Sequence, residues 1–183
     1  MATLSRDASV KGLRMATAER WDADEAVTQL YALHYGSLVR TASFLVRHSG
    51  EAEEIVQDSF VAMHRKWRTL RDTDRAVGYL RKTVVNRARS AQRHHQVVDK
   101  HLPRQVNATA SAEDVAVGAE SRSVVMAALH QLPVRQREVL VLRYYSDLSE
   151  ADIAATLGIS RGAVKSHASR GLNSLRTQLE DQS

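Results

Sequence analysis

The chain is poor in the residues that interrupt helices, and it contains no cysteine. Two prolines and eight glycines among 183 residues leave long stretches free to form helices. The absence of cysteine excludes disulfide bonds and thiolate metal sites, and it fits a cytoplasmic protein. Because only 5% of the residues are aromatic, any hydrophobic core must be built mainly from aliphatic side chains.

Long apolar runs are absent as well. A bilayer is crossed by about 20 consecutive apolar residues, and no run in the sequence approaches that length. The basic residues near the N-terminus are not followed by the apolar core of about 7–15 residues that marks a signal peptide. We therefore expect a cytoplasmic protein that does not use a membrane as a partner.

Charge is distributed unevenly along the chain, whose formal net charge is +5. Residues 19–63 contain three basic and eight acidic residues, whereas residues 64–104 contain twelve basic and three acidic residues. An acidic segment followed by a strongly basic one predicts two neighbouring surfaces that face different partners. The basic surface has the charge expected of a surface that binds nucleic acid.

Apolar residues in the first half of the chain recur every three or four positions, which is the spacing of amphipathic helices. The pattern begins near Val27 and predicts three helices, separated by a break at Ser49-Gly50 and by a charged loop at residues 71–74. Three such helices with short connections predict a bundle. Their apolar stripes are Tyr31, Tyr35, Leu38, Ala42 and Leu45, then Val56, Phe60, Met63, Trp67 and Leu70, and finally Val77, Leu80, Val84, Ala88 and Ala91.

The apolar spacing stops between Gln96 and Glu120, where small and polar residues predominate. Such a segment predicts a flexible linker between two domains. Apolar spacing then resumes, and no strand-like alternation appears anywhere, so the expected fold class is all-α with two small helical domains. The expected boundaries are a flexible N-terminal extension over 1–26, a first domain over 27–95, the linker over 96–120 and a second domain over 121–178.

The strongest local signal lies in residues 149–172 and predicts a helix-turn-helix. Ser149 and Asp152 have the spacing of a capping box at the start of a short helix. Gly158 suits the left-handed conformation that ends such a helix, and Ser160 is placed to cap the next one. The second helix has an expected inner face of Val164, Ala168 and Leu172. Its expected outward residues are Arg161, Lys165, Ser166, Ser169 and Arg170, with His167 to one side.

Two polar faces in the first domain are candidate binding surfaces. A one-sided cationic stripe on the third predicted helix favours contact with the DNA backbone over an ordinary solvated face. An acidic face on the second helix favours a protein partner with basic residues, because acidic side chains repel phosphate. The cationic stripe consists of Lys82, Asn86, Arg89 and Arg93, and the acidic face consists of Glu53, Glu54, Gln57 and Asp58.

Three stretches of the sequence can be compared with a known family: AEEIVQDSFVAMHRKW at residues 52–67, AVGYLRKTVVN from residue 76, and LPVRQREVL from residue 132. In this order they resemble regions 2.2, 2.3–2.4 and 4 of the extracytoplasmic-function (ECF, group 4) RNA polymerase sigma factors of the sigma-70 family. Residues 79–93 resemble an actinobacterial SigE-like subgroup in particular.

The resemblance implies a function and a set of partners. In this family, region 2.2 grips the β′ clamp helices of core RNA polymerase, regions 2.3–2.4 recognise the −10 promoter element and assist DNA melting, and region 4 reads the −35 element beside the β flap. No cofactor, metal or catalytic residue is implied, and an anti-sigma factor is a further candidate partner. The implied polymerase contacts are Glu54, Gln57 and Asp58; the −10 contacts are Arg75, Tyr79, Lys82, Asn86, Arg89 and Arg93; the −35 contacts are Arg161, Lys165, Ser166, His167, Ser169 and Arg170.

Two other functions remain open at this point. The helix-turn-helix is very similar to that of LuxR-type regulators, down to Val164–His167, so a stand-alone DNA-binding regulator is the main alternative. The segment similar to region 2.2 discriminates, because a LuxR-type protein has no reason to carry it. A hydrolase or metal enzyme is the second alternative, since His94, His95 and His101 form a local cluster near Asp99. The sequence contains no HExxH motif, phosphate loop or glycine-flanked serine nucleophile, so we expect no enzyme.

Overall fold

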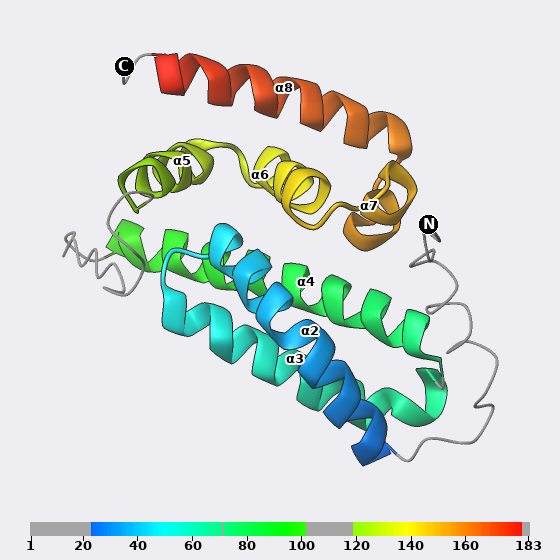
Figure 1. The fold of residues 1–183 in the computed structure, drawn as a ribbon. Helices are drawn as coiled ribbons and strands as arrows, with labels where there is room; N and C mark the ends of the chain where they lie inside the picture. The colour runs from blue at the N-terminus through cyan, green and yellow to red at the C-terminus, as the bar shows by residue number, and fades with distance from the viewer. Residues whose placement is uncertain (1–22, 71, 102–118, 181–183) are drawn as a thin grey trace, which may run out of the picture.

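The computed structural model describes residues 23–70, 72–101 and 119–180, and every regular element within these ranges is a helix (Figure 1). This confirms the all-α fold class. The expected N-terminal extension and most of the expected linker lie outside the described residues. The elements are α2 (Ala23–Leu45), α3 (Ser49–Leu70), α4 (Thr73–His101), α5 (Ala119–Gln131), α6 (Val134–Leu140), the π-helical segment η1 (Val141–Tyr145), α7 (Glu150–Leu157) and α8 (Arg161–Glu180).

Helices α2, α3 and α4 pack against one another as the predicted bundle, the lower layer in Figure 1. The bundle forms because each helix gathers apolar side chains on one side at helical spacing. The α3 stripe is buried from Val56 to Trp67, which is 7% exposed. Helix α4 continues to His101, past the expected start of the linker at Gln96, and Pro103, which cannot continue a helix, comes only after its end.

Helices α7 and α8 form the predicted helix-turn-helix, and the local signals act as expected. Ser149 Oγ accepts a hydrogen bond from the Asp152 amide at 3.1 Å, which caps α7. Gly158 ends α7 in the left-handed conformation, with φ at 66°. Ser160 Oγ accepts a hydrogen bond from the Ala163 amide at 3.1 Å in the first turn of α8. These caps fix the turn between the two helices.

One expectation for the inner face of α8 is wrong. Val164 and Ala168 are buried as predicted, but Leu172 is 38% exposed, and Gly171 takes the buried position instead. The absence of a side chain at Gly171 lets α8 approach α6 closely. The buried stripe of α8 is therefore shifted by one position from the predicted one.

We expect Gly171→Ala to destabilise the protein by about 1–3 kcal/mol, because the added methyl group overpacks the contact between α8 and α6. The new Cβ would lie 3.1 Å from Leu140 Cδ1 and 3.2 Å from Gln136 Cβ. Gly162→Ala is the matched control, since its Cβ would meet only Ser160 Oγ, at 3.8 Å, and alanine favours the helix. Thermal denaturation measures both variants. A Gly171→Ala protein as stable as wild type would show that the two helices adjust without cost.

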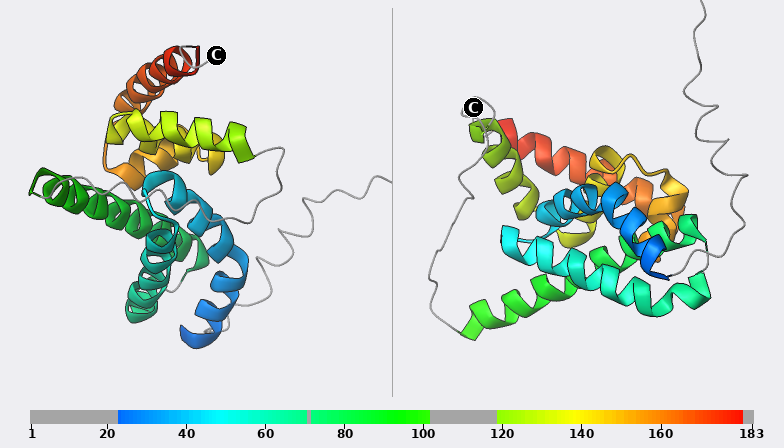
Figure 2. Two further views of the ribbon diagram at one scale, coloured as in Figure 1. Left: turned by 90° about the vertical axis from the view of Figure 1, so that its left-hand side faces the viewer. Right: turned by 60° about the horizontal axis from the view of Figure 1, so that its bottom comes forward.

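Helices α5, α6 and α7, together with η1, form a second layer across the bundle, and α8 lies on the outer side of that layer (Figures 1 and 2). Most buried apolar side chains of the two layers belong to one continuous core, in which Val139 and Ile153 of the second layer join Leu80 and Val84 of the bundle. Leu129, Leu132 and Leu140 form a smaller cluster of their own. The two modules that the sequence predicts are thus packed directly against each other. The sequence does not predict this closed arrangement.

Candidate nucleic-acid interface

The outer face of α8 carries the polar residues expected to contact DNA. Burial of Val164 and Ala168 against the second layer turns the opposite side of the helix outward. With the exception of His167, the expected residues are all exposed on this face: Arg161, Lys165, Ser166, Ser169 and Arg170. Two guanidinium groups, an ammonium group and two hydroxyl groups suit both phosphate oxygens and the edges of bases.

Two of the α8 cations have partners in the same module. Lys165 Nζ lies 3.7 Å from Glu150 Oε2 of α7, and Arg170 Nε donates to the Ser166 carbonyl at 3.3 Å. The Lys165 side chain is 67% exposed, and an ion pair this exposed contributes little to stability. A DNA phosphate can therefore replace Glu150 as the partner of Lys165 at small cost.

His167 is set apart from the other α8 residues. It is partly buried, and its Nδ1 is a buried atom with no hydrogen-bond partner in the described part of the chain. Burial lowers its pKa, the nearby charges of Arg170 and Arg135 lower the pKa further, and Glu138 opposes them. A neutral imidazole at the edge of the helix is a poorer phosphate ligand than the exposed cations.

The cationic stripe of α4 is only partly accessible. Lys82, Asn86 and Arg93 are exposed, and so is Arg75 near the start of the helix. Tyr79 is partly buried and packs against the bundle core. Four of the six expected −10 residues are therefore exposed on the surface.

Lys66 Nζ of α3 lies 5.4 Å from the centre of the Tyr79 ring, within the range of a cation–π contact. Trp67, the nearest other aromatic residue along the chain, is buried in the core. Tyr79 is thus the aromatic side chain of this region that retains some surface.

Arg89, the fourth member of the stripe, reaches across to the second layer. Its Nε donates to Glu138 Oε1 at 2.8 Å, and its Nη2 donates to Glu138 Oε2 at 2.9 Å. Glu138 lies on α6 with 1% of its side chain exposed, and it also accepts a hydrogen bond from Arg135 at 3.2 Å. A bidentate arginine–carboxylate ion pair, largely shielded from water, therefore joins α4 to α6.

A second group of polar contacts joins the same helices. Arg137 of α6 is 5% exposed, and its Nη2 donates to Gln92 Oε1 of α4 at 2.5 Å. Gln92 Nε2 in turn donates to the Leu45 carbonyl at the end of α2. Arg137 Nη1 also donates to the carbonyl and to Nδ1 of His130, at 3.3 and 3.0 Å. The contact between Arg137 and Gln92 connects the second layer to the bundle, and the contacts with His130 connect α6 to α5 within the second layer.

A signal for these contacts is present in the sequence, although they were not among the expected contacts. Residues 135–138 read Arg-Gln-Arg-Glu and are followed directly by the apolar run 139–142. A helix of seven residues with apolar neighbours on both sides has little surface to offer, so some of its charged side chains must be buried and paired. Neither Glu138 nor Arg137 was expected to be a contact residue.

The acidic face of α3 remains on the surface. Glu54 and Gln57 are exposed, and Asp58 is 55% exposed. Asp58 Oδ2 accepts a hydrogen bond from Arg87 Nη1 of α4 at 2.6 Å. The three residues expected to bind a basic partner thus lie together on one helix, and one of them already has a cationic partner.

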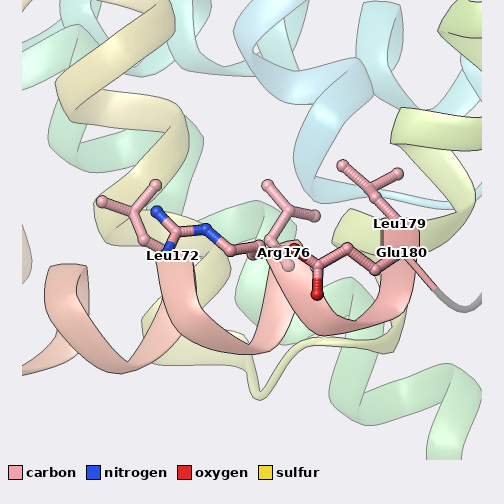
Figure 3. Close-up of a pocket in the computed structure, with 5 residues that line it drawn as sticks. Leu172, Arg176, Leu179 and Glu180 are labelled. Atoms are coloured by element: carbon pink, nitrogen blue, oxygen red, sulfur yellow. The ribbon is translucent and has the colours of Figure 1, made fainter.

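Apolar side chains also gather along the C-terminal part of α8. Leu172, Leu175 and Leu179 line a shallow groove of about 560 Å³, with Arg176 and Glu180 at its side (Figure 3). The side chains of this groove all come from α8 and project beyond the helix-turn-helix. The groove therefore lies further along α8, on the C-terminal side of the polar residues 161–170.

The histidines offer no metal site in the described residues. Within 23–70, 72–101 and 119–180, no group of three or more His, Asp or Glu side chains is arranged to hold a metal ion. His95 Nε2 instead lies 2.9 Å from Glu51 Oε1. The side chains of Asp99 and His101 lie outside the described part of the structure. None of the described helices is both long enough and apolar enough to cross a membrane.

Comparisons with known proteins agree with this arrangement of surfaces. A family model described as "Sigma-70 region 2" matches residues 30–98, and one described as "Sigma-70, region 4" matches residues 122–175. An RNA polymerase sigma-E factor of Streptomyces avermitilis is 33% identical over 147 residues, which cover 79% of each protein. The RNA polymerase sigma factor CarQ of Myxococcus xanthus is 32% identical over 158 residues, which cover 86% of this chain and 91% of CarQ.

One more relative and two solved structures are similar to this chain. The ECF RNA polymerase sigma factor SigM of Mycobacterium tuberculosis is 30% identical over 79% of this chain and 72% of its own. CnrH, solved with the cytosolic domain of CnrY, superposes with a TM-score of 0.67 at 25% identity over 91% of this chain and all of CnrH. The sigma factor RpoE of Bartonella quintana, solved with the anti-sigma factor NepR, superposes with a TM-score of 0.63 at 25% identity over 84% of this chain and 96% of its own.

The match over residues 30–98 covers the bundle, which a stand-alone LuxR-type regulator does not account for, so that alternative is not supported. Both helical modules match the same family, in the order that the sequence motifs predict. The chain belongs to the sigma-70 family of RNA polymerase sigma factors, in its extracytoplasmic-function group.

Proposed function

We propose that this sigma factor binds core RNA polymerase and directs it to promoters with −35 and −10 elements, and that it uses a separate surface for each of these three contacts. The acidic face of α3 binds the polymerase, the cationic stripe of α4 contacts the −10 element, and the outer face of α8 contacts the −35 element. The observation that carries the proposal is the presence of all three polar faces on the surface of one chain, in the order of the family regions.

The closed arrangement described above must open for this function. At about 3.4 Å per base pair, the −35 and −10 elements lie roughly 85 Å apart along DNA. Helix α4, with 29 residues, is the longest of the described helices and measures about 44 Å at 1.5 Å per residue. A molecule in which α6 and α7 rest on α4 cannot place α4 and α8 at both elements. We infer that the two modules separate on the polymerase, which also frees Arg89 for DNA.

The module boundaries that we propose are the ones expected from the sequence. We propose that residues 27–95 act as the −10 and polymerase-binding module, and residues 121–178 as the −35 module, with residues 96–120 connecting them. The matched ranges of the two family models, 30–98 and 122–175, support this division. A connection of this length allows the modules to move apart while both stay bound to one polymerase.

We propose further that an anti-sigma factor is a partner of this protein, as it is for the RpoE of Bartonella quintana. The relatives are sigma factors, a class that acts by binding, so we assign no catalytic residue, cofactor or metal to this chain and place the chemistry on the polymerase. A sigma factor works where the polymerase and the chromosome are, so we propose a cytoplasmic location.

Run-off transcription tests the proposed function directly. Purified protein mixed with sigma-free core polymerase and a library of promoter fragments should yield discrete transcripts that core polymerase alone does not produce. Binding of the protein alone to a promoter, with no gain in specific transcripts, would point instead to a stand-alone regulator.

The −35 surface makes a quantitative prediction. We expect Lys165→Ala to weaken promoter binding by the holoenzyme. If Lys165 contacts only phosphate, all sequences should lose affinity about equally and the slope of log affinity against log salt should fall by about one. If it reads a base, discrimination at one position should relax at a cost of ~1–3 kcal/mol.

Arg176→Ala is the matched control for this measurement, because Arg176 is exposed on the same helix but lies beside the apolar groove, about 16 Å further along the helix axis than Lys165. Promoter binding should be unchanged in the control. Wild-type promoter binding and transcription by the Lys165 variant would remove Lys165 from the DNA surface, and equal losses in both variants would indicate a general effect of net charge.

A further inference from the structure

A pocket of about 300 Å³ lies between the two modules, away from the three surfaces described above. The bundle contributes Arg47, Gln92 and His95 to its wall, and the second layer contributes a segment around the start of α6. That segment consists of His130, Gln131, Leu132, Pro133, Val134 and Arg137. The pocket exists only while the modules are closed, because each supplies one side of it.

The polar groups of the pocket are nearly all hydrogen-bond donors or cations. Arg47 and Arg137 bring guanidinium groups, and Gln131 brings an amide. His130 Nδ1 receives a hydrogen bond from Arg137 Nη1, so its Nε2 carries the proton and is a donor as well. His95 Nε2 pairs with Glu51 Oε1, whereas Glu51 Oε2 is buried with no hydrogen-bond partner in the described residues. The lining residues include no Asp or Glu.

In the described part of the chain, Arg137 is a buried cation without a carboxylate in direct contact. It is 5% exposed, and within the described residues its direct partners, Gln92 and His130, are neutral. Its Nε is buried and has no hydrogen-bond partner among the residues that the structure describes. The adjacent carboxylate of Glu138 is taken up by Arg89 and Arg135. Buried charges in proteins are paired as a rule, so an anion is the missing group at this position.

The electrostatic environment supports the same conclusion. Burial, together with the positive charges of Arg137 and Arg47, lowers the pKa of His130 to about 4. The groups that surround His130 therefore repel a further positive charge. Burial, the larger cause, disfavours an unpaired charge of either sign, but the two guanidinium groups attract an anion.

We propose that this pocket binds a small anion of the phosphate class, either inorganic phosphate or the phosphate group of a small metabolite, and that the anion holds the two modules together. Donors on both walls of the pocket suit the tetrahedral array of phosphate oxygens, and arginine can bind phosphate with two parallel hydrogen bonds. An anion that contacts Arg47 and Arg137 at once bridges the bundle and the second layer. Because the closed form alone has the pocket, binding shifts the protein toward the closed form.

Inorganic phosphate and adenosine monophosphate, each titrated into the full-length protein at constant ionic strength, are the probes. We expect saturable binding by calorimetry and a rise in the pKa of His130 followed by NMR of the imidazole ring. Binding of both probes identifies the phosphate group as sufficient, and binding of the nucleotide alone identifies an organic phosphate as the ligand. A response equal to that of chloride, or an unchanged His130, would overturn the proposal.

Arg137→Gln and Arg47→Gln each remove one of the converging cations, and each should weaken binding roughly 10- to 100-fold. Arg47 is exposed two residues after the end of α2, so its variant keeps the test decisive if the buried Arg137 variant does not fold. Arg65→Gln, an exposed arginine of α3 outside the pocket, should bind phosphate like wild type. Equal weakening in all three would mean that phosphate binds the basic surface diffusely. The test needs neither polymerase nor promoter, so its outcome is independent of the proposed function.

Discussion

Replacement of Glu138 by glutamine is expected to open the molecule. The substitution removes the negative charge that two guanidinium groups share, and leaves Arg89 and Arg135 facing a neutral amide. Loss of a hydrogen-bonded charge costs about 1.5–3 kcal/mol, which shifts the balance between closed and open forms roughly 10- to 100-fold. Small-angle X-ray scattering should show a larger radius of gyration, and core polymerase should bind the variant more tightly because less closed protein competes with binding.

Glu150→Gln is the matched control. Glu150 also has two cationic neighbours, Arg143 at 3.3 Å and Lys165 at 3.7 Å, but both belong to its own module. Its loss should leave the radius of gyration unchanged. If the Glu138 variant keeps its helical circular dichroism and the compact dimensions of wild type, the pair with Arg89 does not hold the modules together.

The acidic face of α3 carries the second large effect. We expect Glu54→Lys to weaken association with core polymerase by several kcal/mol if the contact is shielded from water, because the charge reversal turns attraction to a basic surface into repulsion. Glu54 is exposed, so the folded structure should tolerate the change. Asp58 is a less clean choice, since its charge reversal would also place a lysine beside Arg87.

A pull-down or fluorescence-anisotropy titration with core polymerase measures this effect, with circular dichroism as the check on folding. Glu25→Lys serves as the control, because Glu25 is an exposed acid in the first turn of α2, outside the predicted contact. Wild-type affinity of the Glu54 variant would move the polymerase contact to another surface. Equal weakening of the control would indicate a general effect of net charge.

Short-range features of the fold were predictable because they depend on residues close in sequence. The turn between α7 and α8 needs only the caps at Ser149 and Ser160 and the left-handed Gly158, and each acts as expected. Burial of Trp67 likewise follows from its place on the helical stripe of α3. Local rules decide such positions, so one sequence is enough.

The inner face of α8 shows where local rules end. Residues three and four positions after Ala168 both lie next to it on a helix, so spacing alone cannot choose between Gly171 and Leu172. The choice depends on α6, whose Leu140 side chain occupies the space that a side chain at position 171 would need. A larger apolar residue looks like the better core candidate, and the close approach of two helices selects the smaller one.

The contact between Arg89 and Glu138 depends on residues 49 positions apart, and nothing in either local pattern pairs them. The charge pattern of α4 identifies a surface that attracts anions, but it does not distinguish DNA phosphate from a glutamate of the same chain. The predicted −10 residues Lys82, Asn86 and Arg93 remain exposed, while Arg89 is shared between two possible partners.

The continuous core has a consequence for how the protein unfolds. Val139 and Ile153 share a cluster with Leu80 and Val84, so unfolding of either module exposes buried core side chains of the other. The closed protein should therefore show a single calorimetric transition, with equal van't Hoff and calorimetric enthalpies. Once the modules separate, each has its own smaller core, and two overlapping transitions replace the one. Cooperativity of melting thus becomes a readout of whether the two modules are in contact.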